Sequence, residues 1–181
     1  MLASDLEQLF AATFYPGYRT RLLGGADEPL YLPAGEGRGC HQLFYREDYF
    51  SSALHETAHW CIAGEERRRL VDFGYWYTPD GRTLQQQRAF EAVEIKPQAL
   101  EWLFATAAGV PFAVSADNLA GADAEARQPS PHFLAAVERQ AVAWCRAGLP
   151  PRAASFVRAL TAFYGTRNPL DPDLYLGRHT P

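Results

Sequence analysis

At residues 52–64 the chain reads Ser52-Ala53-Leu54-His55-Glu56-Thr57-Ala58-His59-Trp60-Cys61-Ile62-Ala63-Gly64. The spacing of its apolar residues and the closing glycine predict a helix from about Asp48 to Ile62 that stops at Gly64. Because His55 and His59 are four residues apart, a helix places both imidazoles on one face, one turn apart. Glu56 completes the His-Glu-x-x-His pattern, in which two histidines share one cation. This helix is therefore predicted to carry half of a metal site.

The remaining protein ligand has to come from another segment, because no third histidine follows at the spacing of the extended pattern. Residues 90–98 offer two carboxylates, Glu91 and Glu94. Glu94 lies beside an apolar stripe at helical spacing, whereas Glu91 lies further round towards solvent. The stripe consists of Phe90, Val93, Pro97, Leu100 and Phe104. Glu94 is therefore the predicted third ligand, and Glu91 is the reserve.

A set of two histidines and one carboxylate leaves coordination positions open. Such a site can hold zinc with an activated water, or iron(II) with room for dioxygen. With zinc, Glu56 is the predicted general base of a peptidase or another hydrolase. With iron, Glu56 is predicted to orient the substrate or a bound water. The motif alone favours zinc hydrolysis but leaves iron open, and a non-catalytic module braced by its metal is a third interpretation.

The rest of the chain predicts a mainly helical α+β domain with a few short strands, covering residues 1–181 as one unit. Four further helices are expected: from Ser4 to Pro16, from Thr83 towards Ala108 with a kink or break at Pro97, from Ser130 to Ala147 and from Pro151 to Tyr164. Short strands are expected at residues 27–34 (an edge strand), 70–77 and 110–115. Residues 121–131 are rich in Ala, Asp and Pro and predict a surface loop.

The composition of the chain excludes several classes of protein. Of the 181 residues, 48% are hydrophobic and 21% are charged, as in a globular protein. No apolar run is long enough to span a membrane and the N-terminus is unlike a signal peptide, so we expect a soluble, cytoplasmic protein. A formal net charge of −4 argues against direct nucleic-acid binding. The three cysteines contain no Cys-x-x-Cys pair and are expected to be free thiols.

With these residues in view, the sequence resembles the bacterial elongation factor P hydroxylase family over nearly its whole length. The resemblance is densest in residues 52–64. It continues in Leu70-Val71-Asp72-Phe73-Gly74-Tyr75-Trp76-Tyr77, in Pro79-Asp80-Gly81-Arg82, in Phe90-Glu91, Val93-Glu94 and Lys96-Pro97-Gln98-Ala99-Leu100, and in Ser115 and Asp117-Asn118-Leu119. Motifs of this length and order are specific to one family.

The resemblance implies a monooxygenase-type hydroxylase that acts on the modified lysine of elongation factor P, as a late step in the modification of this translation factor. It also implies a zincin-like fold, similar to zinc metallopeptidases, and Fe(2+) as the expected ion, with zinc possible. The ligand roles then fall on His55, His59 and Glu94. The common 2-oxoglutarate oxygenases carry a His-x-Asp element, which this chain lacks, so we expect no 2-oxoglutarate. The expected partners are elongation factor P and dioxygen, and the expected state is a monomer.

A modified lysine is a long cationic side chain, so the resemblance also bears on the entrance to the site. An acidic and aromatic entrance suits such a substrate. Asp72, Tyr75 and Tyr77 are the predicted substrate-binding residues, and Glu101 is a further candidate for neutralising the cation.

Overall fold

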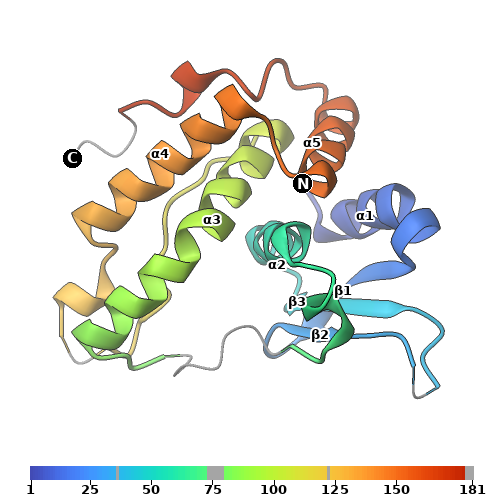
Figure 1. The fold of residues 1–181 in the computed structure, drawn as a ribbon, viewed down its shortest axis with the longest axis horizontal. Coiled ribbons are helices and arrows are strands. Elements are labelled where there is room, and N and C mark those ends of the chain that lie inside the picture. The colour runs from blue at the N-terminus through green and yellow to red at the C-terminus, as the bar shows by residue number, and fades with distance from the viewer. Residues whose placement is uncertain (36, 73–79, 122, 178–181) are drawn as a thin grey trace.

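The chain folds into five α-helices and a small sheet over the residues that the computed structural model describes, which are 1–35, 37–72, 80–121 and 123–177. The helices are α1 (Ala3–Tyr18), α2 (Phe50–Ile62), α3 (Leu84–Ala108), α4 (Pro131–Ala147) and α5 (Pro151–Tyr164). The strands are β1 (Thr20–Ala26), β2 (Leu30–Leu32) and β3 (His41–Arg46). The predicted mainly helical α+β class is confirmed (Figure 1).

The sheet has the strand order β1-β3-β2. β1 runs parallel to β3 with Leu22 opposite Leu43, and β2 runs antiparallel to β3 with Tyr31 opposite Leu43. Alternate residues of β3 are buried, namely Leu43 and Tyr45, because successive side chains of a strand point to opposite faces. β2 lies at the edge of the sheet, so the edge strand predicted within residues 27–34 is confirmed.

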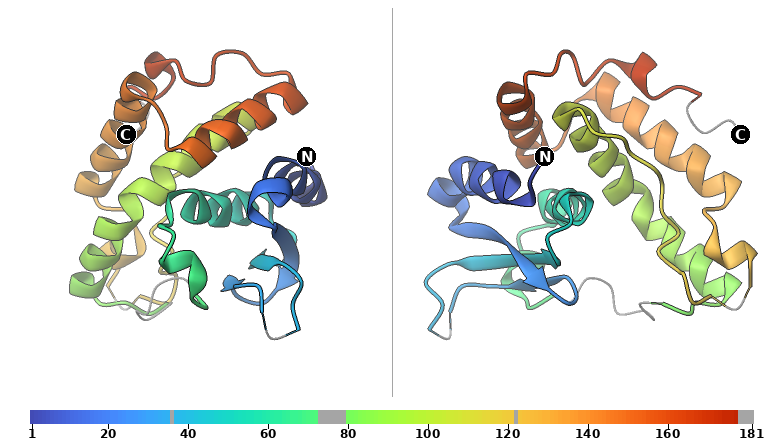
Figure 2. Two further views of the ribbon diagram at one scale, coloured as in Figure 1. Left: turned by 45° about the vertical axis from the view of Figure 1, so that its right-hand side comes forward. Right: turned by 180° about the vertical axis from the view of Figure 1, so that it is seen from behind.

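Helices α1 and α2 lie together on one side of the sheet, and α3, α4 and α5 stand beside them (Figures 1 and 2). Trp60 of α2 packs against α1, with its ring centroid 5.1 Å from that of Phe10 and 4.8 Å from that of Phe14. One contiguous apolar core takes residues from all five helices and from the sheet. This shared core supports the prediction of one domain over residues 1–181, which stays a prediction, as does the zincin-like architecture.

All five predicted helices are present, although some details differ. α1 continues past Pro16 to Tyr18, and α3 runs from Thr83 as N-cap through Pro97 without a break. Pro97 removes one backbone hydrogen bond of a helix of 25 residues, and buried residues on both sides hold its turns together. Within residues 121–131, a short 3-10 helix (Glu125–Arg127) places a buried Ala126 against the protein, so this loop is more ordered than expected.

The strand predicted at residues 110–115 is wrong. At Ser115 a side chain takes the place of a neighbouring strand, because Gln98 accepts a hydrogen bond from the Ser115 N–H and donates one to the Ser115 carbonyl. Of the strand predicted at residues 70–77, Asp72 forms an isolated antiparallel bridge with Tyr31, and residues 73–77 lie outside the described part of the chain.

Two further sequence expectations are met. The three cysteines are free thiols, with Cys61 buried and Cys40 and Cys145 half-buried. Among the described residues, no helix combines the length and the apolar character that crossing a membrane requires.

Candidate metal centre

The two histidines of α2 converge as their spacing predicts. The opposite face of α2 is buried in the core through Ala53, Leu54 and Cys61, which turns His55 and His59 towards a cavity. Their Nε2 atoms lie 3.0 Å apart. Two nitrogens that each lie about 2.1 Å from one ion, at an angle of about 90 to 109°, are about 3.0 to 3.4 Å apart. The pair is therefore spaced to share a single cation.

Glu94 of α3 completes the cluster. Its Oε1 lies 3.3 Å from the Nε2 of His59, and its Oε2 lies 3.6 Å from the Nε2 of His55. The side chain is only 2% exposed, and its Oε2 is a buried oxygen with no hydrogen-bond partner among the described residues. Because a buried carboxylate oxygen without a partner is costly, a cation at this point would remove the penalty. The three side chains offer ligand atoms within 4.8 Å of one another and fit a divalent metal.

The reserve ligand, Glu91, is not part of this cluster. Both of its carboxylate oxygens are engaged at the start of α4, where Oε1 accepts from the Ser130 N–H at 2.8 Å and Oε2 accepts from the Ser130 hydroxyl at 2.6 Å. Phe90, Pro97, Leu100 and Phe104 of the expected stripe are buried, whereas Val93 is 42% exposed and Glu91 is buried, so the inward face of α3 differs from the stripe at these two positions. Glu94 lies on that inward face, which explains why it meets the histidines.

Glu101 contacts His55 on the side of the ring that faces away from the cluster. It follows Glu94 by two helical turns on α3, and its Oε2 lies 2.8 Å from the Nδ1 of His55. This contact commits the other ring nitrogen, Nε2, to the cluster, and metal-binding histidines are commonly oriented by such a carboxylate. Glu101 is therefore not a free carboxylate for a cationic substrate, contrary to the expectation from the sequence. Its spacing from Glu94 is a signal that predicts a shared helix face, although it does not reveal the partner.

The protonation of the cluster shows how closely its charges are coupled. Burial alone lowers the pKa of His55, but the hydrogen bond and charge of Glu101 and the charge of Glu94 outweigh it and raise the pKa to about 10. Burial raises the pKa of Glu94, but the charge and hydrogen bond of His59 outweigh it and leave that pKa below its ordinary value. A metal ion needs a neutral imidazole and an ionised carboxylate, so it would take the place of the proton that the cluster holds.

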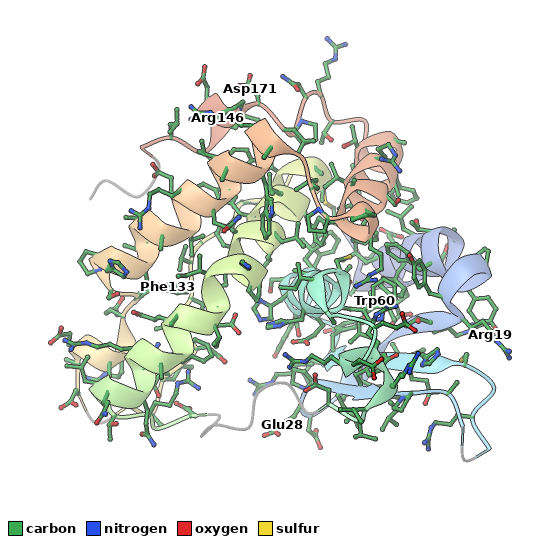
Figure 3. The ribbon with its side chains drawn as sticks, viewed as in Figure 1. Arg19, Glu28, Trp60, Phe133, Arg146 and Asp171 are labelled. Carbon is green, nitrogen blue, oxygen red and sulfur yellow. The ribbon has the colours of Figure 1, made fainter. Side chains whose placement is uncertain are left out.

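The cluster opens into a cavity of about 600 Å³ between the sheet, α2, α3 and residues 113–119. Glu56 lines the same cavity, and burial raises the pKa of its carboxyl group while the neighbouring charges of His55 and His59 lower it. Glu28, labelled in Figure 3, lies below α2 beside the sheet and also belongs to the wall. Part of the wall is apolar, including Phe90 and Leu119, so the cavity can take a long side chain with a polar end.

Of the three predicted substrate-binding residues, the structure describes only Asp72. Asp72 lines the cavity, but Nε of Arg67 lies 2.5 Å from its carboxylate, so its charge is already paired. Tyr75 and Tyr77 lie outside the described residues. The sequence interpretation missed Arg82 and Asp117, which also line the cavity. No regular spacing links these two residues to the metal motif, and only the tertiary fold brings them to it.

We expect Glu101 to set metal affinity through His55. Replacing Glu101 with alanine should weaken metal binding by about 10- to 100-fold, the usual effect of removing a carboxylate behind a histidine ligand. Glu101→Gln should lose less, because its amide oxygen can still accept from the Nδ1–H of His55. Titration of the metal-free protein with zinc in competition with a chelator measures this order. Equal affinities for the wild type and Glu101→Ala would show that the contact does not orient His55.

Two helices bring a His-Glu-x-x-His motif and a distant glutamate together, so the chain has the ligand arrangement of the HExxH class and could hold a metal ion. A sequence model of the family described as elongation factor P hydroxylase matches residues 9–175. The chain is also 48% identical over 167 residues to the elongation factor P lysine hydroxylase of Haemophilus influenzae, and the match covers 92% of each chain. The chain belongs to the elongation factor P hydroxylase family.

Proposed function

We propose that this protein hydroxylates the modified lysine of elongation factor P, using an iron ion held by His55, His59 and Glu94. The observation that carries the proposal is the three-ligand cluster, which faces a cavity large enough for a long side chain. The family name and the name of the Haemophilus influenzae relative supply the substrate and the reaction type. The reaction is proposed to follow other modification of the same lysine, in the cytoplasm, with the protein acting as a monomer on a zincin-like scaffold.

The chemistry favours iron over zinc for this reaction. Hydroxylation replaces a C–H bond by C–OH; one atom of dioxygen enters the product and the other leaves as water, with two electrons and two protons from a reductant. Bound iron(II) would supply the redox activity and the open coordination positions that oxygen chemistry requires, whereas zinc has no redox chemistry. Since the chain has no His-x-Asp element, the proposed donor is a reductant other than 2-oxoglutarate.

The surrounding side chains are proposed to prepare the site for this chemistry. Glu101 holds the ring of His55 so that Nε2 faces the cluster. Glu56, which lies between the two histidines in sequence and lines the cavity, would orient the substrate or a bound water. The buried position of Glu94 keeps water away from its carboxylate and strengthens the charge interactions around it.

A zinc-dependent peptidase or other hydrolase remains the second candidate, because one observation favours it. Glu56 lines the same cavity as both histidines, which is the position of the general base in hydrolases with this motif. Under that alternative, cleavage would need zinc and an ionised Glu56, and Glu56→Gln would abolish it.

A single experiment separates the two candidates. The metal-free protein is loaded with iron(II) or with zinc and incubated with elongation factor P carrying its modified lysine, a reductant and dioxygen labelled with heavy oxygen. We expect the iron-loaded protein alone to add one labelled oxygen atom to the factor, as measured by the intact mass. Cleavage of the factor by the zinc-loaded protein, or an oxygen atom derived from water, would contradict the proposal.

A further inference from the structure

Of the carboxylates that line the cavity, four already have contacts within the protein. Glu94 belongs to the cluster with His55 and His59, and Glu101 contacts His55 at 2.8 Å. Asp72 is paired with Arg67 at 2.5 Å. Asp80 accepts hydrogen bonds from two backbone N–H groups, those of Gly81 at 2.7 Å and Ala120 at 2.8 Å, and these bonds lower its pKa. Each of these four carboxylates therefore already takes part in a contact within the protein.

Asp117 differs from them, because its carboxylate lines the cavity without any hydrogen bond or ion pair from a residue that the structure describes. The nearby guanidinium of Arg82 does not pair with it. Arg82 donates instead to the backbone carbonyls of Ala116 and Asp117 and to the side chain of Gln87. The Arg82 charge therefore fixes the position of the segment and leaves the Asp117 carboxylate available.

The backbone holds Asp117 in a defined position at the wall. Its φ of 46° lies in the left-handed region, and its N–H donates to the hydroxyl of Ser115 at 3.0 Å. The next residue, Asn118, is buried and bonds both the N–H and the carbonyl of Arg82 and the carbonyl of Ala126. These contacts anchor the segment on both sides of Asp117, so its carboxylate is presented by a rigid support.

The electrostatic surroundings of Asp117 connect it with the metal cluster. Asp117 is an exposed residue, yet the protein packed around its carboxyl group raises the pKa, while the charges of Arg82 and His55 lower it and the charge of Glu94 raises it. Asp117 is thus close enough to the cluster to interact with both a histidine and the carboxylate ligand. A cation beside Asp117 would lower the pKa of its carboxyl group and favour the ionised form. The same contact would hold the cation next to the metal cluster.

We propose that Asp117 receives an ammonium group of the substrate lysine and thereby selects a cationic side chain for the metal site. This inference rests on the proposed function. It assigns to Asp117 the role predicted from the sequence for Asp72, whose charge Arg67 already pairs. A charge-assisted contact of this kind fixes the direction of a long side chain, whose methylene groups can lie along the apolar part of the wall.

The test compares two factors and three enzymes. The factors are elongation factor P carrying its modified lysine and the same factor with that lysine replaced by methionine. The enzymes are the wild type, Asp117→Asn and Asp123→Asn. Asparagine tolerates the left-handed conformation of residue 117, so the fold should persist. Asp123 is a matched control, because it is exposed in the same connection between α3 and α4 and does not line the cavity.

Calorimetric binding should show that the wild type and Asp123→Asn prefer the lysine form by about 10- to 100-fold, and that Asp117→Asn loses this preference. In turnover, Asp117→Asn should raise KM by a similar factor while its metal content stays that of the wild type. A preserved preference in Asp117→Asn, with the wild type active, would overturn the inference alone. A wild type that neither binds nor hydroxylates the factor would overturn the proposed function and this inference with it.

Discussion

Replacing His55 or His59 with alanine is expected to abolish metal binding and to lower hydroxylation of elongation factor P by about 1000-fold or more. Each imidazole is one of the three ligand side chains that the described residues bring together in the cluster, so its removal leaves two. Metal content after loading and dialysis, and the rate of oxygen incorporation by mass spectrometry, measure the two effects.

The matched control is His132→Ala on the exposed surface of α4, which should bind metal and turn over as the wild type does. The histidine variants should remain folded, because the side chains of His55 and His59 are 26% and 18% exposed and add little to the apolar core. Full metal content and turnover in His55→Ala would show that the metal, if needed, binds elsewhere. Loss of metal without loss of turnover would separate the cluster from the reaction.

The part of this site that could be predicted from sequence is the part set by local geometry. His55 and His59 meet because four residues make about one helical turn, whatever the rest of the fold does. Glu94 could be predicted from the helical spacing of the apolar residues around it. The reserve ligand Glu91 binds Ser130 instead, and this contact between two helices cannot be predicted from the spacing within one helix. The same is true of Glu101, whose partner His55 lies 46 residues away.

The fold follows the same division between local and distant contacts. Thr83 and Ser130 are the N-cap residues that precede helices α3 and α4, and these capping signals are local. β1 was not predicted, because its glycine pair, Gly24-Gly25, interrupts any alternation of apolar and polar residues. Gly24 is needed there by a distant residue: a Cβ at this position would lie 2.6 Å from the hydroxyl of Tyr45 in β3. Tertiary packing therefore stabilises β1, and the local sequence pattern does not predict this strand.

The second large effect is expected on stability. Replacing Arg82 with methionine should lower the free energy of unfolding by about 2 to 5 kcal/mol, because several buried acceptors lose their donor and each unsatisfied group costs about 1 to 3 kcal/mol. Arg82 is 1% exposed, and its guanidinium bonds Gln87, Ala116 and Asp117 and lies 3.9 Å from the ring centroid of Phe90. Methionine keeps much of the volume but leaves the buried carbonyl oxygens without their donor. Urea unfolding measures the change.

The matched control is Arg88→Met, an exposed arginine near the start of α3, which should change the free energy of unfolding by less than about 0.5 kcal/mol. At temperatures where Arg82→Met is folded, its zinc affinity should stay near that of the wild type, because the described hydrogen bonds of Arg82 go to Gln87, Ala116 and Asp117. Its preference for a lysine-carrying factor should fall, because Arg82 fixes the backbone of Asp117. An Arg82→Met variant as stable as the wild type would show that the Arg82 hydrogen bonds add no net stability. Equal losses of zinc binding and factor binding would show that Arg82 supports the whole cavity and not only the segment that carries Asp117.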